Sequence, residues 1–265
     1  MDTLKLLLIS IVQGITELLP VSSSAHILLL GNFLKIDISS TLLVLFHLGT
    51  TLGIIVFFWK KIFCNLFSKS KIIFFSKLLL ASVPAGVVGL LFDDIISSKL
   101  RAEWILAISL VFGGIVLIFV EKRFTKNNDK KIDDIEKISW KQALIIGLSQ
   151  TIALIPGTSR SGITTITGIF LGLEKYTAFE YSFFLSIPIL TGTFVWLLIQ
   201  NQSESILNIV GEPLIPNTLI IILATCFFGL LTLNILKRIK RKNWLTFFGI
   251  YRIALGLFVL IYFYL

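Results

Sequence analysis

Six stretches of the chain are apolar over a length that can cross a lipid bilayer. A hydrocarbon core of about 30 Å needs roughly 20 predominantly apolar residues in a helix, and these stretches come close to that length. We therefore predict transmembrane helices near residues 41–59, 76–92, 104–120, 178–200, 217–236 and 244–265.

Two further apolar segments are interrupted near their middle. Residues 4–34 contain Pro20, residues 141–173 contain Pro156, and small polar residues follow each proline directly. Proline removes a backbone donor and clashes with the preceding turn of a helix. Each segment therefore predicts a hairpin of two helices separated by a break, which we call the first and the second hairpin.

The composition is typical of a polytopic membrane protein. The 265 residues are 55% hydrophobic and 15% charged, with a mean hydropathy of +0.92, more than a soluble domain carries. The net charge of +9 does not indicate nucleic-acid binding, because the basic residues stand in short clusters between apolar runs. Two cysteines, Cys64 and Cys226, predict no disulfide framework.

Lysine and arginine residues in short loops predict which end of each span faces the cytoplasm. Basic residues gather at 60–77, at 121–141 and at 237–242, whereas acidic residues prevail at 93–103 and 201–216. This orientation makes the first hairpin enter and leave the membrane from outside and the second from the cytoplasm. Both hairpins are therefore predicted to be re-entrant.

The chain divides into two similar halves, residues 1–120 and 141–265, joined by a cytoplasmic linker at 121–140. Each half holds one hairpin followed by three spans, and "LPVSS" in the first break recurs as "IPGTS" in the second. An odd number of spans inverts the second half relative to the first, as in many transporters, whose interrupted segments form the binding site. We predict an all-α polytopic membrane protein, one integral membrane domain over 1–265, with six transmembrane helices and two re-entrant hairpins in an inverted-topology repeat.

The second break, "PGTSRSGITT", surrounds one guanidinium with hydroxyls and glycines. A helix that resumes here points free N–H groups and the positive end of its dipole at the break, which favours an anion. Arg160 adds a fork of donors matched to phosphate or carboxylate. Alternatively, Arg160 snorkels or pairs structurally with Glu17. The other expected substrate-binding residues of this break are Gly157, Thr158, Ser159, Ser161, Gly162 and Thr164.

The first break offers a carboxylate and an amide on one helical face. Gln13 and Glu17 are four residues apart, a spacing that places them on the same side of a helix. Glu17 can ligate a divalent cation or accept a proton, and Gln13 can add an oxygen ligand. An ionisable residue at bilayer depth is costly, which favours a functional role for Glu17.

Three serines and a histidine follow that carboxylate. Ser22, Ser23 and Ser24 supply hydroxyls, and His26, one turn into the next helix, can act as acid, base or nucleophile near neutral pH. His47 stands alone in "LFHLGT" and is interpreted as a structural residue. Together the two breaks suit phosphoryl transfer at a lipid phosphate or pyrophosphate.

"QGITELLPVSSSAH" with "PGTSRSG" closely resembles the undecaprenyl pyrophosphate phosphatase family, the bacitracin-resistance integral membrane phosphatases, over nearly the whole chain. The resemblance implies hydrolysis of undecaprenyl pyrophosphate to undecaprenyl phosphate and inorganic phosphate, which recycles the carrier lipid of peptidoglycan synthesis and confers bacitracin resistance. It also implies a multi-pass protein of the bacterial cytoplasmic (inner) membrane, an active site open to the outer face, and a divalent metal, Mg²⁺ or Ca²⁺.

The resemblance also assigns roles to residues. It implies a metal held by Glu17 and Gln13; many members have Glu where this chain has Gln13, so Glu17 becomes the principal ligand. The family's motif serine and histidine fall on Ser23 and His26, with Ala25 where many members have Gly. These reactive groups are intact in this chain.

The mechanism leaves alternatives. We expect Arg160 to grip the diphosphate and Ser23, activated by His26 or Glu17, to attack it, but His26 itself or an oriented water is another candidate nucleophile. The rival function is a polyprenyl phosphate transporter or flippase, which would use the same arginine without needing His26. The partners expected are the lipid substrate and membrane lipids, and a homodimer is one assembly to be tested.

Overall fold

The six predicted spans are helices, each long and apolar enough by length and composition to cross a membrane. They are α3 (Ser40–Phe57), α5 (Lys69–Leu91), α7 (Glu103–Phe124), α10 (Lys175–Ile199), α12 (Leu214–Arg238) and α13 (Trp244–Tyr264). The computed structural model describes residues 3–98, 100, 102–124, 131–199, 214–238 and 243–264, with the backbone alone at 94, 97–98 and 214–216. The prediction of an all-α polytopic membrane protein is confirmed for these residues.

Both interrupted segments are helices separated by a break, as predicted. The first hairpin comprises α1 (Thr3–Thr16) and α2 (Ser23–Leu34). The second comprises α8 (Trp140–Gln150), the short 3-10 helix η2 (Thr151–Leu154) and α9 (Arg160–Phe170). Pro20 and Pro156 lie in the two breaks, where a missing backbone donor costs nothing. The smaller helices are α4 (Trp59–Phe63), α6 (Asp93–Ser98) and η1 (Ile135–Lys137).

The first basic cluster, residues 60–77, was predicted to be a loop, but its second part lies in a helix. Lys71 and Lys77 lie inside α5 and are buried, because the helix begins after Ser68, whose side chain accepts the backbone N–H of Lys71. Lys71 forms an ion pair with Glu136 at 2.8 Å, and Lys77 donates to the backbone oxygen of Ile138 at 2.6 Å. These lysines therefore anchor the end of the linker to α5. Parts of the other predicted loops, 125–130, 201–213 and 239–242, lie outside the described residues.

The chain forms two compact units. Unit 1 contains Met1–Leu18, Ala25–Cys64 and Ser186–Lys240, and unit 2 contains Leu19–Ser24, Asn65–Leu185 and Arg241–Leu265. Each unit takes segments from both predicted halves. The single-domain assignment and the boundaries of the repeat stay predictions.

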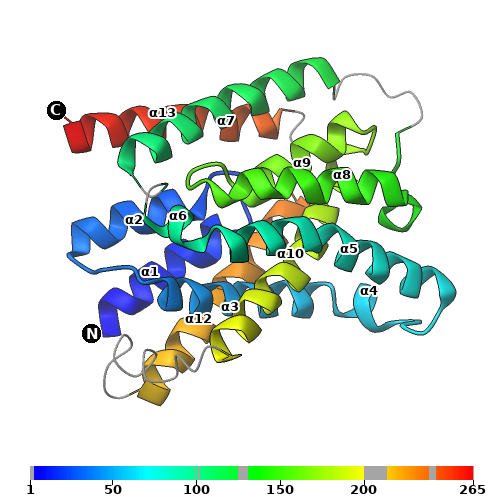
Figure 1. The fold of residues 1–265 in the computed structure, drawn as a ribbon, viewed down its shortest axis with the longest axis horizontal. Helices are drawn as coiled ribbons and strands as arrows, with labels where there is room; N and C mark the ends of the chain where they lie inside the picture. Colours follow the sequence, from blue (N-terminus) through cyan, green and yellow to red (C-terminus); the bar gives the residue numbers. More distant parts are fainter. Residues whose placement is uncertain are drawn as a thin grey trace. The chain divides into compact units, whose positions relative to one another are not determined.

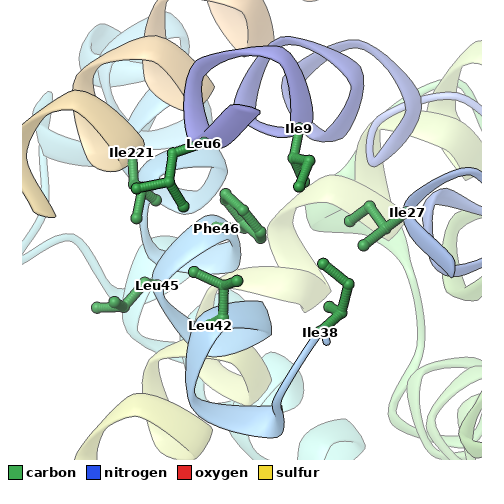
Figure 2. Close-up of a cluster of buried hydrophobic side chains, with 8 residues drawn as sticks. All are labelled: Leu6, Ile9, Ile27, Ile38, Leu42, Leu45, Phe46 and Ile221. Carbon is green, nitrogen blue, oxygen red and sulfur yellow. The ribbon is translucent and has the colours of Figure 1, made fainter. Parts of the chain in front are cut away.

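Unit 1 is built around α12, which packs against both α1 and α3. The backbones approach closely where α1 carries Gly14, since a Cβ there would lie 2.8 Å from the backbone oxygen of Thr225. Small residues allow such close contact between helices in a membrane. Figure 2 shows the apolar side chains that meet beneath α1: Leu6, Ile9, Ile27, Ile38, Leu42, Leu45, Phe46 and Ile221.

Unit 2 holds two helix pairs, α7 with α13 and α5 with α8. Figure 1 shows α7 and α13 running side by side. In unit 1 the first hairpin packs on α12, and in unit 2 the second hairpin packs on α5, so each hairpin contacts the middle span of the other half. These pairings agree with a repeated half. The re-entrant course of the hairpins and the inverted orientation stay predictions.

Candidate functional site

The carboxylate of the first break lies one turn beyond Gln13. The backbone N–H of Glu17 donates to the backbone oxygen of Gln13 at 2.9 Å, which continues the helical geometry of α1. Nε2 of Gln13 donates to Oε2 of Glu17 at 3.2 Å, and both residues are buried. The prediction that they share one face is confirmed.

His47 of α3 joins this pair. Its Nε2 lies 3.4 Å from Oε2 of Glu17, because α3 packs against α1 in unit 1. The sequence interpretation as a lone structural histidine missed this contact, since thirty residues separate the two side chains and nothing local links them. The structure adds His47 as a candidate partner of the carboxylate.

The side-chain oxygens of Gln13 and Glu17 fit a hard divalent cation. Oε1 of Gln13 is buried and has no hydrogen-bond partner among the described residues, and it belongs to the residue that bonds the Glu17 carboxylate. Carboxylate and amide oxygens are ligands that Mg²⁺ and Ca²⁺ prefer, and Mg²⁺ commonly completes its shell with water and substrate phosphate. Within the described part of the chain, no cluster of three or more His, Cys, Asp or Glu forms a protein-only metal cage.

A serine with positive φ precedes the helix that follows each break. Ser22 stands before α2 and Ser159 before α9, each with a φ of 69°. Such a conformation costs about 1–3 kcal/mol for a residue other than glycine and tends to mark functional sites. Oγ of Ser159 accepts the N–H of Gly162 at 3.2 Å and so caps α9. The two breaks therefore share a strained entry into a helix.

The two break loops, residues 19–24 and 155–162, contact each other within unit 2. Oγ of Ser161 donates to the backbone oxygen of Leu19 at 3.0 Å, and the N–H of Gly157 lies 3.4 Å from Oγ of Ser24. Hydroxyl pairs extend the network within each loop, Ser22 with Ser24 at 3.0 Å and Ser159 with Ser161 at 3.3 Å. The structure thus brings Ser22 and Ser24 of the first motif together with Ser159 and Ser161 of the second.

Arg160 is the first residue of α9 and is partly buried. Its Nη1 donates to the backbone oxygen of Ser182 at 3.1 Å. Oγ1 of Thr164 lies 2.8 Å from the backbone oxygen of Arg160 and 2.7 Å from Oγ of Ser182. Ser182 on α10 therefore contacts both Arg160 and Thr164. No pattern in the sequence singled out this serine. Thr158 is partly buried in the loop before them.

Ser23 and His26 occupy the first turn of α2. The helix begins at Ser23, and His26 follows three residues later, which confirms its predicted place one turn into the helix. Residues three apart lie on the same side of a helix. Both side chains are partly exposed.

Arg252 of α13 is a site residue that the sequence analysis missed. It is completely buried, and it donates to backbone oxygens in both break loops and in α7. The available signal was an arginine inside an apolar span, which is costly and marks a functional position by default. The contacts themselves depend on tertiary packing that no local pattern reveals.

The chain is similar to known proteins of one family over nearly its whole length. A family model described as bacitracin resistance protein BacA matches residues 6–258. The chain is 37% identical to undecaprenyl-diphosphatase 1 of Clostridioides difficile, with 100% of this chain and 97% of the relative covered. It is 37% identical to undecaprenyl-diphosphatase of Campylobacter jejuni, covering 100% and 95%, and 32% identical to undecaprenyl-diphosphatase of Methanococcus aeolicus, covering 99% of each.

Proposed function

The chain belongs to the bacitracin resistance protein BacA family, and we propose that it hydrolyses undecaprenyl diphosphate to undecaprenyl phosphate and inorganic phosphate. The observation that carries the site is the contact between the two break loops, each with a positive-φ serine before a helix. Two helix N-termini and an arginine favour a phosphate-bearing ligand. The reaction recycles the carrier lipid for peptidoglycan synthesis and underlies bacitracin resistance.

Arg160 grips the diphosphate. Its position at the start of α9 adds a guanidinium to the positive end of the helix dipole. Charge develops on the phosphoryl oxygens during transfer, and preorganised donors stabilise that charge most in the transition state. The hydroxyls of Ser159, Ser161 and Thr164 hold this helix start in place through the contacts above.

Ser23 is our preferred nucleophile. Its Oγ attacks the terminal phosphorus while the bond from that phosphorus to the bridging oxygen breaks, and undecaprenyl phosphate leaves. His26 accepts the hydroxyl proton, and water then hydrolyses the phosphoserine to release inorganic phosphate and restore Ser23. Direct attack by His26 and attack by an oriented water are the alternatives.

Glu17 and Gln13 are the residues that would hold Mg²⁺ or Ca²⁺, through a carboxylate oxygen and the orphaned amide oxygen. Such an ion, when bound, supplies positive charge that neutralises diphosphate oxygens. His47 contacts the same carboxylate and restricts its orientation.

The six candidate spans indicate a multi-pass membrane protein. We place it in the bacterial cytoplasmic membrane with the site open to the outer face, as the resemblance to the undecaprenyl pyrophosphate phosphatase family implies. Exposed apolar side chains of the spans offer the polyprenyl tail a surface compatible with lipid. Light scattering in detergent tests whether the protein is a homodimer.

A polyprenyl phosphate transporter is the second candidate. It is favoured because each hairpin packs on the middle span of the other half, as expected for a repeat-built transporter. Phosphate release separates the two functions. Purified protein in detergent is given undecaprenyl diphosphate with and without Mg²⁺, and the wild type is compared with His26→Ala. Metal-dependent release that collapses in the variant supports the phosphatase. Lipid translocation in vesicles without phosphate release, equally fast in the variant, supports the transporter.

A further inference from the structure

Arg252 carries a buried charge that is paired with backbone oxygens. Among the described residues it contacts no carboxylate, and its guanidinium donates to four carbonyl oxygens. Nη1 reaches Thr158 at 2.9 Å and Pro20 at 3.4 Å, and Nη2 reaches Gly157 at 2.8 Å and Ser109 at 3.0 Å. Removing a charge from water costs several kcal/mol. These carbonyl dipoles offset part of that cost.

The hydrogen bonds from Arg252 satisfy carbonyl groups that the two breaks leave without helical partners. Backbone outside a helix leaves carbonyl groups without intrahelical partners, and at membrane depth each such group is costly unless protein satisfies it. Pro20, Gly157 and Thr158 belong to the two break loops. A single guanidinium satisfies carbonyls in both loops at once and so ties their backbones to α13.

This arrangement also fixes where the neighbouring N–H groups point. In a trans peptide the C=O and the following N–H are directed oppositely. The carbonyls of Pro20 and Thr158 turn toward Arg252, so the N–H groups of Val21 and Ser159 turn away from it. Neither N–H has a partner among the described residues, although Val21 is 3% and Ser159 is 9% exposed. N–H groups without a protein partner are rare in buried residues and call for an explanation, and a bound anion is one.

We propose that Arg252 is a positioning residue that presents the backbone N–H groups of Val21 and Ser159, one from each break loop, to the phosphate groups of the substrate. This inference rests on the proposed phosphatase function for the identity of the ligand. Arg160 touches the substrate, whereas Arg252 acts through the backbone. Donors that the fold holds in place add most to binding of the transition state, so their loss lowers kcat more than it raises KM.

Gly113 on α7 makes room for the guanidinium, since a Cβ there would collide with Nη2 of Arg252. Gly113→Ala therefore displaces the group and keeps its charge. Gly89→Ala on α5 is the matched control, because its Cβ would meet Leu154 at 3.7 Å, an ordinary contact. Lys175→Met is a second control, because it breaks the buried ion pair with Glu121 at 2.8 Å. Glu121 lies about 18 Å along α7 from Ser109, the α7 residue that Arg252 contacts, so this control breaks an ion pair at a distance from the guanidinium.

The test measures amide hydrogen exchange in peptides covering residues 19–24 and 155–162, with and without inorganic pyrophosphate. In the wild type and both controls, pyrophosphate is expected to slow exchange in both loops together. Arg252→Met and Gly113→Ala are expected to abolish this protection in both. Arg252→Lys keeps the charge with fewer well-directed donors and is expected to retain part of the protection.

Kinetics on the same samples complete the test. Arg252→Met is expected to lower kcat for phosphate release roughly 100-fold with a smaller change in KM, normalised to folded protein. Wild-type protection and kcat within about twofold in Arg252→Met and Gly113→Ala would overturn the proposal. If Arg252→Met fails to fold, Gly113→Ala and Arg252→Lys decide the question by the same two measurements. Wild-type protein that shows the protection pattern but releases no phosphate would contradict the phosphatase and leave the positioning role standing.

Discussion

Ser161 donates its hydroxyl hydrogen to the backbone oxygen of Leu19 across 3.0 Å, and this bond joins two loops that lie 142 residues apart in the chain. In each loop, a serine with positive φ directly precedes the first residue of a helix. Neither loop alone offers two helix starts, so in the proposed function it is their union that would supply donors to both phosphate groups of the substrate. The bond thus links the paired motifs of the sequence to diphosphate chemistry.

Gly157→Ala is expected to destabilise the protein more than Gly172→Ala. Both glycines have a strongly positive φ, 91° and 88°, so alanine is strained at either site by about 1–2 kcal/mol. A Cβ at Gly157 would also lie 2.5 Å from the backbone oxygen of Leu106, whereas one at Gly172 would meet nothing within 4 Å. Thermal unfolding in detergent should rank the variants in that order. Equal midpoints would show that the break loop tolerates the extra atom.

Gln13→Glu is expected to make stability depend on Mg²⁺. A second carboxylate beside Glu17 repels the first without a cation and adds a ligand with one. The unfolding midpoint should fall in chelator and rise with Mg²⁺ by more than in the wild type. Gln150→Glu is the control, because Gln150 is also buried with neither amide atom bonded among the described residues. A Mg²⁺ response of equal size in the control would contradict a cation site at Gln13.

His47→Leu is expected to raise the Mg²⁺ concentration needed for half-maximal phosphate release by roughly tenfold, because residues that orient a ligating carboxylate affect metal binding by 10–100-fold. His47→Gln retains an N–H donor toward Glu17 and should lie closer to the wild type. A magnesium titration of the initial rate checks both variants. Identical curves for His47→Leu and the wild type would leave His47 with a packing role alone.

A phosphoenzyme is expected on Ser23. Undecaprenyl diphosphate labelled at its terminal phosphate is mixed with enzyme and quenched, and the labelled peptide is identified. Phosphoserine survives acid, whereas phosphohistidine is lost in acid and survives alkali, so the stability of the label distinguishes attack by Ser23 from attack by His26. Label at Ser23 that disappears in Ser23→Ala supports our preferred route. Label at His26 would transfer the nucleophile to the histidine.

Much of this protein is readable from its sequence because the bilayer imposes simple rules. Apolar length predicts the spans, and proline followed by small polar residues predicts the breaks at Pro20 and Pro156. The helical period predicts the shared face of Gln13 and Glu17. These features depend on local chemistry alone.

These local rules do not predict contacts between segments that are distant in the chain. His47 reaches Glu17 because α3 packs on α1, and Arg252 reaches both break loops because α13 packs on α7. The burial of Lys71 inside α5 depends on Glu136 of the linker. In each case a polar side chain in an apolar helix signalled a partner, and tertiary packing determined which partner it was.

The most direct test of one phosphate site built from two breaks compares kcat/KM for phosphate release from undecaprenyl diphosphate in the wild type, Ser23→Ala, Arg160→Ala and the double variant. If both residues serve one reaction, each single change should cost at least about 100-fold, and the double variant should lose far less than the product of the two losses. Losses that multiply fully, or single variants with near wild-type rates, would contradict a shared site.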